Sequence, residues 1–460
     1  MADQLSALDA TFLELEQADE SAHMHIGAVL VFERRSGGAP ATDEVRRRLA
    51  LRLDALPRYR QRLSHPQVGG TAFPHWEPDT GFDLDHHVRR AALPAPGGAS
   101  ELLDWAGDFY SHRLDRARPL WKVVILEGLA GGRWALAIKT HHCLVDGVGS
   151  IDAGSILLDT SREAEDAVDL PAPVHDDGDG GNGGLLSLPV RLVRGGAQAA
   201  LHPRDTLRRS AALTELLVRD ELVAAPHTSL NAPIGTHRRL ATIGAPLAEL
   251  KELRLALGGT VNDVVLTAVS GGLRALLLAR GEQPPEGGLR AMVPVNVRPA
   301  GERVDLGNHI SSLFVSLPVD AADARAMHER VRRETSALKH SGQVLGADTL
   351  LALAGLAPPL LHAVVARSLY ATRLFNVTVT NVPGPQQPMY AFGARLTDAI
   401  PLVPLAADHA LGVAVLSFDG QVVFCLNCDR DGVPDVAVAA RGIADTLGEL
   451  RAACAAAVAP

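Results

Sequence analysis

Residues 139–149 read KTHHCLVDGVG, and they are the most informative stretch of the chain. The preceding run WALAIKT predicts a β-strand, and the following run VGSIDAGSILLD predicts a helix. The segment therefore places two adjacent histidines at a strand end, followed by an acid and a glycine at fixed offsets. Gly147 lacks a Cβ, so the chain can turn sharply there into the helix. We expect the chemistry of the protein at this junction.

The histidine pair allows three chemical interpretations. A neutral imidazole can take a proton from an alcohol or a thiol near pH 7 and return it later, which favours a catalytic base. A pair of hydrogen-bonded structural histidines is the second interpretation. A metal site is the third, although adjacent residues of a strand point to opposite faces and suit shared ligation poorly. The residue pattern favours the base and leaves the other two open.

Helices and strands interleave on both sides of this segment without the strict rhythm of a doubly wound sheet. The predicted fold class is therefore α/β, of the mixed α+β kind. The predicted helices cover residues 43–56, 101–114 and 261–279. The predicted strands cover residues 25–32, 121–126, 134–140, 289–297, 311–317, 375–381, 409–417 and 422–427.

The chain of 460 residues is long enough for two or three domains. A break in composition, PAPVHDDGDGGNGG at residues 171–184, cannot bury enough apolar surface to offset its ordering entropy. We therefore predict an N-terminal domain at 1–160 and a C-terminal domain at 226–460. A linker at 161–225 joins them, disordered in its acidic part and then helical.

The overall charge and composition exclude some classes of protein. The net charge of −9 and an aromatic content of 4% disfavour a nucleic-acid binder. Four cysteines cannot form a disulfide framework, so a reducing compartment is expected. The N-terminus carries acids where a secretory signal needs a basic flank, and apolar runs such as 350–366 are interrupted. We expect a cytoplasmic protein without a spanning helix.

HHCLVDG resembles the HHxxxDG signature of the CoA-dependent acyltransferase superfamily, which includes chloramphenicol acetyltransferases and peptide-synthetase condensation domains. Further segments occur in order along the chain: LSALDATFLELE, ARPLW, TVNDVV, PVNVRP, LGNHISSLFVSLP and NVTVTNVPGP. Together they resemble the bacterial wax ester synthase/acyl-CoA:diacylglycerol acyltransferase family over nearly the whole chain. The combination of PLW, ND and NVPGP is typical of this lipid-forming branch.

The resemblance implies two chloramphenicol acetyltransferase-like domains with a substrate tunnel between them. His142, the second histidine of the signature, would be the general base, and His141 would orient the loop. Gly147 completes the signature. Asp146 would pair with an arginine from a distant strand, for which Arg298 in PVNVRP is the candidate and Arg303 the competitor.

Three further residues have both a structural and a catalytic interpretation. Asn262 and Asp263 stand at the start of a predicted helix, where their residue types suit N-terminal capping. The resemblance adds a supporting role in catalysis. Asn381 stands at a strand-to-turn junction, and a role in shaping the tunnel is the functional alternative.

The resemblance implies an O-acyltransferase that needs no metal or other cofactor and uses acyl-CoA as a co-substrate. Its acceptor would be diacylglycerol or a fatty alcohol, which implies peripheral contact with a membrane surface or a lipid droplet. A homodimer is possible. Two alternatives are a condensation-type acyltransferase acting on a carrier-protein thioester or a polyketide alcohol, and a catalytically weak lipid-binding member.

Overall fold

The computed structural model describes residues 3–64, 74–144, 156–163, 225–296, 310–341 and 374–458. The helices in these segments are α1 Ala7–Ala18, α2 Thr42–Arg52, α3 Leu84–His87, α4 Ala99–Ser111, α8 Leu247–Leu257, α9 Val261–Ala279, α10 Ala324–Ser341 and α13 Val436–Val458. The strands are β1 Asp3–Gln4, β2 His25–Phe32, β3 Gln61–Leu63, β4 His75–Pro78, β5 Val88–Ala92, β6 Trp121–Glu127, β7 Trp134–His141, β8 Arg238–Pro246, β9 Leu289–Asn296, β10 Ile310–Leu317, β11 Val377–Pro383, β12 Tyr390–Ala391, β13 Ala394–Leu402, β14 Leu411–Phe418 and β15 Gln421–Asp429.

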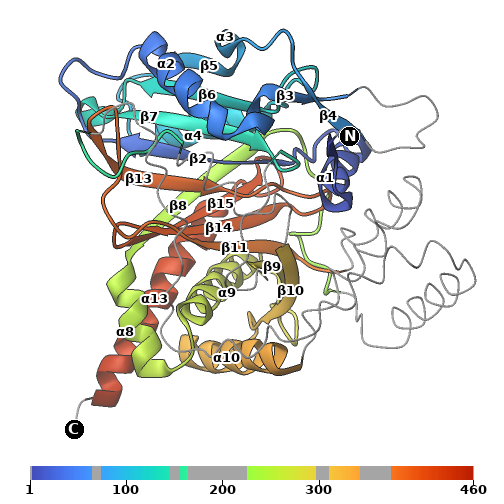
Figure 1. Ribbon diagram of the computed structural model, residues 1–460. Coiled ribbons are helices and arrows are strands. Elements are labelled where there is room, and N and C mark those ends of the chain that lie inside the picture. Colours follow the sequence, from blue (N-terminus) through green and yellow to red (C-terminus); the bar gives the residue numbers. More distant parts are fainter. Residues whose placement is uncertain are drawn as a thin grey trace, which may run out of the picture.

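Two six-stranded sheets form the body of the molecule, which confirms the mixed α/β fold class (Figure 1). The first sheet has the order β12-β13-β2-β7-β6-β5, and the second has the order β10-β9-β11-β14-β15-β8. A small sheet, β1-β4-β3, lies beside the first. Figure 1 shows α2 and α3 above the first sheet, and α8, α9, α10 and α13 on the far side of the second.

The C-terminal part of the chain completes the first sheet. Strand β13 pairs antiparallel with β2, so that Ile400 lies opposite Val29 and Leu402 opposite Gly27. The polypeptide therefore crosses between the sheets within the unit predicted at 226–460. The predicted domain bounds stay a prediction, but the division of strands between the sheets does not follow the chain order.

Local sequence explains where the predicted elements begin and end. The predicted helix 43–56 ends already at Arg52 and continues as a 3₁₀ turn, Leu53–Ala55. Pro57 follows, and the residue before a proline is driven out of the helical region.

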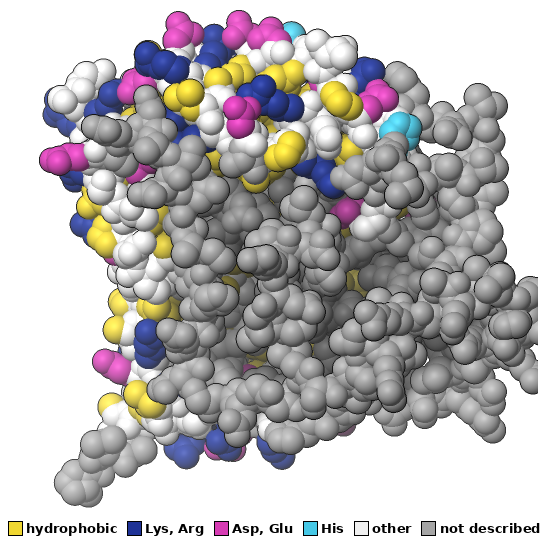
Figure 2. Space-filling view, viewed as in Figure 1, with side chains coloured by type: hydrophobic (Ala, Val, Ile, Leu, Met, Phe, Trp, Pro, Cys, Tyr) yellow, Lys and Arg dark blue, Asp and Glu magenta, His cyan; other side chains and the backbone are white. Residues whose placement is uncertain are grey.

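Around α2 and α3, basic and acidic side chains are mixed on the surface, as Figure 2 shows. One ion pair, between Arg46 and Asp85 at 3.0 Å, joins the two helices.

Helix α9 lies among the helices on the far side of the second sheet (Figure 1). Its 19 residues have the length and apolar composition that could cross a membrane, but 72% of the window is buried inside the molecule. Neighbouring α13 approaches it at glycines, because a Cβ on Gly272 would lie only 2.6 Å from the carbonyl oxygen of Ala439. These packing features identify α9 as a core helix. The interrupted apolar run 350–366 lies outside the described residues.

Candidate functional site

The two histidines of the motif lie where the central strand β7 ends. β7 is buried along its whole length between β2 and β6, and its last residue, His141, lies opposite His25 of β2. Helix α1 meets this end of the strand with Phe12 and Glu16. The two α1 residues are four positions apart and so share one face of the helix. Phe12 contacts His142, and Glu16 contacts His141.

His142 is held by its backbone and by the face of its ring. Its N–H donates to the carbonyl oxygen of Met24 at 2.8 Å, and its ring stacks on Phe12 with the centroids 3.9 Å apart. Within the described part of the chain, its buried Nδ1 has no hydrogen-bond partner. Burial lowers the pKa of His142 to about 4, and nearby His141 adds to this shift. The ring is therefore neutral at pH 7, the state that can accept a proton.

His141 is fixed through both ring nitrogens. Nε2 lies 3.0 Å from Oε2 of Glu16, and Nδ1 accepts the backbone N–H of Cys143 at 3.1 Å. These partners assign the ring proton to Nε2. The Cys143 Sγ also lies 3.0 Å from Nδ1, and burial raises the pKa of this thiol, so it stays protonated. His141 thus joins α1 to the turn after β7, and its role in orienting the loop stays a prediction.

Glu16 is a buried acid that contacts the first histidine of the motif. Its side chain is 2% exposed, and its Oε2 also accepts the N–H of Met24 at 3.2 Å. Arg116 reaches Oε1 at 3.4 Å, and Nε2 of His25 lies 4.0 Å from Oε2. Burial alone would raise the pKa of Glu16. The hydrogen bond and charge of His141, with the charges of His25 and Arg116, instead hold this pKa well below its usual range. We call Glu16, His25, Arg116 and His141 the Glu16 cluster.

Sequence analysis assigned no function to Phe12, Glu16 or His25. The first two lie in LSALDATFLELE, which contributed only to the family resemblance. A sign was present there, because Glu16 falls one helical turn after the apolar Phe12 and Leu13 and so shares their face of the helix. Such a buried acid requires a partner, but the sequence does not show that this partner lies 125 residues away.

The structure separates the roles of Asn262 and Asp263. Asp263 and Thr260 form a reciprocal capping box, and the hydroxyl of Thr335 donates to Asp263 at 2.7 Å. Asn262 instead accepts a hydrogen bond from Nδ2 of Asn381 at 3.0 Å. The structure thus brings α9 and β11 together at the two asparagines. No hydrogen bond of the described residues joins this pair to His142, and the supporting roles stay predictions.

The other predicted site residues, Asp146, Gly147, Arg298 and Arg303, lie outside the described residues. The predicted ion pair of Asp146 therefore stays a prediction. Within the described segments, no three His, Cys, Asp or Glu side chains gather as metal ligands. The expectation of chemistry without a cofactor also stays a prediction.

The sequence matches two family descriptions. The wax ester synthase/diacylglycerol acyltransferase catalytic domain matches residues 5–265, and the WS/DGAT C-terminal domain matches residues 306–451. A Mycobacterium tuberculosis protein named probable diacylglycerol O-acyltransferase tgs1 is 34% identical and aligns over 97% of this chain and 95% of its own. Its counterpart named tgs2 is 32% identical over 93% of this chain and 94% of its own.

Solved structures agree with these sequence matches. A wax ester synthase/diacylglycerol acyltransferase from Marinobacter aquaeolei matches with a TM-score of 0.68 and 27% identity, over 98% of this chain and 100% of that one. The starter condensation domain of rhizomide synthetase, in complex with C8-CoA, matches with a TM-score of 0.60 and 17% identity. That match covers 98% of this chain and 95% of the other, and at this identity it shows a shared fold.

Proposed function

The chain belongs to the wax ester synthase/diacylglycerol acyltransferase family and is an acyltransferase, and on this premise we propose its substrates and its base. It transfers a long-chain acyl group from acyl-CoA to the hydroxyl of diacylglycerol or of a fatty alcohol. The products are triacylglycerol or wax ester, together with free CoA. The observation that carries the proposal is the neutral His142 ring, which stacks on Phe12 and directly follows His141 of the Glu16 cluster.

The proposed reaction needs one proton carrier. His142 takes the proton of the acceptor hydroxyl while the oxygen attacks the thioester carbonyl carbon. The carbon–sulfur bond of the tetrahedral intermediate then breaks, and the imidazolium returns the proton to the leaving thiolate. A thioester already carries a good leaving group, so orientation of the base and closeness of the two substrates supply much of the catalysis.

The test is acyl transfer by a His142→Ala variant. Purified protein receives a long-chain acyl-CoA with either diacylglycerol or hexadecanol, and release of free CoA is followed. We expect His142→Ala to lower turnover at least about a hundredfold, the lower end of general-base catalysis. His237→Ala is the matched control, because His237 is exposed on the loop before β8. Near-normal turnover in a folded His142→Ala protein would contradict the assignment, and the two acceptors show which alcohol is preferred.

We further propose that the protein meets its acceptors at a membrane surface or a lipid droplet, as a peripheral protein in the cytoplasm. The proposal is supported by the nature of the acceptors, which dissolve in lipid, and by the burial of α9 inside the fold. Alkaline washing of membranes should therefore release the protein. Release only after the bilayer is dissolved in detergent would contradict peripheral attachment.

A further inference from the structure

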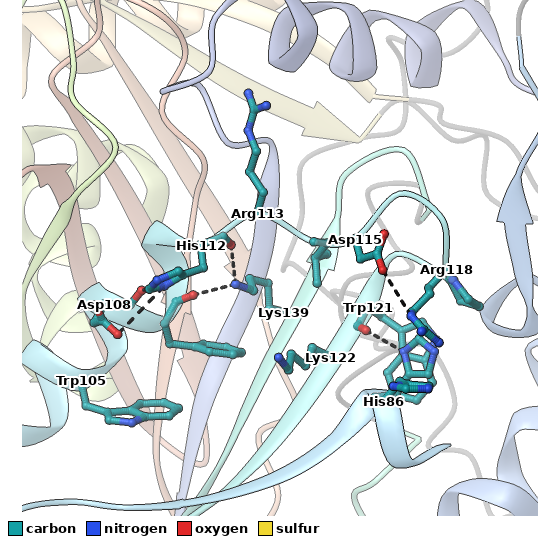
Figure 3. A pocket seen from close by; sticks show the side chains of 14 residues that line it. His86, Trp105, Asp108, His112, Arg113, Asp115, Arg118, Trp121, Lys122 and Lys139 are labelled. Atoms are coloured by element: carbon teal, nitrogen blue, oxygen red, sulfur yellow. Dashed lines mark hydrogen bonds and ion pairs between the residues drawn. The ribbon is translucent and has the colours of Figure 1, made fainter. Parts of the chain in front are cut away.

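A polar cavity lies beside the first sheet, at the C-terminal end of α4. Its volume is about 290 Å³, and it is lined by the end of α3, by α4 and the loop that follows it, and by β6 and β7. Figure 3 shows Lys122 and Lys139 beside one another in this cavity, with Trp105 at its edge. None of these three residues belongs to the motif of the histidines.

The two lysines are an unusual pair for this chain. Lys122 of β6 and Lys139 of β7 lie directly opposite each other in the antiparallel register. Like charges at such positions destabilise a sheet. The chain holds only four lysines, at positions 122, 139, 251 and 339, and its other basic residues are arginines. Half of the lysines thus meet in one cavity, where their mutual repulsion requires compensation.

Contacts within the protein stabilise the positive charge of Lys139 only in part. Its side chain is buried, and Nζ donates to the carbonyl oxygens of Phe109 and His112, each at 2.6 Å. An ammonium carries three N–H groups, so one remains for another acceptor. Burial lowers the pKa of Lys139 to about 7, and the charge of Lys122 adds to this shift. A negative charge in the cavity would stabilise the ammonium form.

Lys122 has even less compensation. Its side chain is half-buried, and the described part of the chain offers its ammonium no hydrogen-bond or ion-pair partner. Two carboxylates line the cavity, and the charge of one of them, Asp108, partly offsets the lowering of the Lys139 pKa without an ion-pair contact. Asp115 lies 3.2 Å from Nε of Arg118, and Asp108 lies 4.0 Å from Nδ1 of His112. Among the described residues, the Lys122 ammonium and one N–H of Lys139 thus have no hydrogen-bond acceptor, although Nζ of Lys139 also lies 4.3 Å from the centre of the Phe109 ring.

We propose that this cavity binds a phosphate group of a small molecule between the side-chain nitrogens of Lys122 and Lys139. Several oxygens on one phosphorus can accept from both ammonium groups, and lysine serves phosphate as a point charge. The source is either inorganic phosphate or the nucleotide part of CoA. The second source rests on the proposed function, and Trp105, stacked on Phe109 at 5.2 Å between centroids, would offer its base a ring.

The loop that follows α4 contacts both the cavity and the Glu16 cluster. Leu114 lines the cavity, and its N–H donates to Nε2 of His25 at 3.4 Å. Arg113 also lines it and donates to the carbonyl oxygen of Glu16 at 2.6 Å. A bound phosphate would therefore lie one loop away from the residues that hold His141.

The proposal is tested by direct binding to the full-length protein. Trp105 and Trp121 line the cavity, so tryptophan fluorescence reports its occupancy. Inorganic phosphate and adenosine 3′,5′-bisphosphate are titrated separately at constant ionic strength. We expect saturable binding of at least one probe, and a Kd at least about tenfold weaker in Lys122→Gln, as for the loss of a charged hydrogen bond. Lys122→Arg keeps the charge and should keep binding.

Lys251→Gln is the matched control, since Lys251 is exposed on α8. Binding of inorganic phosphate with the expected loss in Lys122→Gln supports a site for phosphate alone. Binding of the bisphosphate only, with the same loss, supports CoA as the source. No saturable binding of either probe, or equal affinity in wild type and Lys122→Gln, overturns the proposal. The readout needs no turnover, so a failure of the proposed acyl transfer would be seen separately.

Discussion

Glu16 gives the two neighbouring histidines different surroundings. His141 donates its Nε2 proton to a buried carboxylate, whereas the contacts of His142 within the described segments are the face of Phe12 and a backbone hydrogen bond. The carboxylate therefore fixes the ring of His141, and it does not contact the ring of His142. Burial lowers the pKa of His142 and keeps its ring neutral at pH 7. We therefore propose Glu16 as a positioning residue, which acts on the proposed base, His142, through His141.

Replacing Glu16 by Gln should destabilise the protein in a way that depends on pH. At pH 7 we expect the free energy of unfolding to fall by about 1–3 kcal/mol, because the amide keeps one acceptor oxygen for Met24 and His141 but places an NH2 donor where Oε1 accepts from Arg116. The pKa of Glu16 is depressed in the folded state, so its contribution is present above the unfolded value and is lost as the pH falls. The difference between wild type and variant should therefore shrink at pH 4, by on the order of 1 kcal/mol.

Urea unfolding at pH 7 and pH 4 measures this difference. Glu20→Gln serves as the control, since Glu20 is exposed just beyond α1. A difference between wild type and Glu16→Gln that stays constant with pH would mean that the ionised carboxylate contributes nothing and that only packing was changed. Turnover of the same variant should fall with the loss of His141 orientation.

Single elements with strong local signals were predictable from sequence. The observed bounds of β2 and α9 equal the predicted ones, because a continuous apolar run and a capped 3.6-residue period identify them. β8 and β13 were not predicted. β13 reads ARLTDAIPL, and its polar residues and proline interrupt the alternation of apolar and polar residues that is typical of a strand. Its partner β2 lies far away in the chain, and local periodicity carries no information about such pairing.

The contact between α9 and α13 requires a small residue at position 272. A Cβ there would lie 2.6 Å from the carbonyl oxygen of Ala439 and 2.7 Å from Cγ1 of Ile443. A backbone oxygen inside a helix cannot move aside cheaply, so Gly272→Ala should lower the free energy of unfolding by about 1–3 kcal/mol. Gly448→Ala on α13 is the opposite case, because its Cβ would meet only Nη2 of Arg451 at 3.7 Å.

Denaturant unfolding of both glycine variants shows whether each substitution raises or lowers the free energy of unfolding. Gly448→Ala should be neutral or should stabilise by up to about 1 kcal/mol, since alanine is the better helix former. Gly272→Ala stabilising the protein as well would show that helix propensity, and not close packing, governs this helix pair.

At the scale of the whole molecule, the site depends on parts of the chain that meet only in the folded state. Elements α1, β2 and β7 bring Phe12, His25 and His141 together. Strand β13, from the C-terminal half of the chain, pairs with β2 in the same sheet. Arg238 of β8 also reaches back to the carbonyl oxygen of Ser21, which precedes β2. Sequence motifs located His141 and His142. They could not locate the Glu16 cluster, because its contacts are long-range.

Three histidines near this site, His23, His25 and His142, make the stability of the molecule sensitive to acid. Burial lowers the pKa of His23 to about 4, and the nearby charge of Arg238 adds to this shift. His25 and His142 are lowered by burial as well. Between the unfolded value near 6.5 and the folded value near 4, the unfolded chain binds protons that the folded chain does not. The free energy of unfolding must therefore fall as the pH falls through this window.

Each such histidine contributes a slope of about 1.4 kcal/mol per pH unit in this window. His23→Gln removes one titrating group, and its amide can still donate to the carbonyl oxygen of Glu20 that Nε2 of His23 contacts at 3.0 Å. We expect the slope between pH 6 and pH 5 to decrease by about 1 kcal/mol per pH unit in this variant. Exposed His237, changed to Gln, should leave the slope unchanged. Equal slopes in wild type and His23→Gln, measured by urea unfolding, would show that His23 takes up its proton without unfolding, and the acid sensitivity would then have to come from His25, His142 and Glu16.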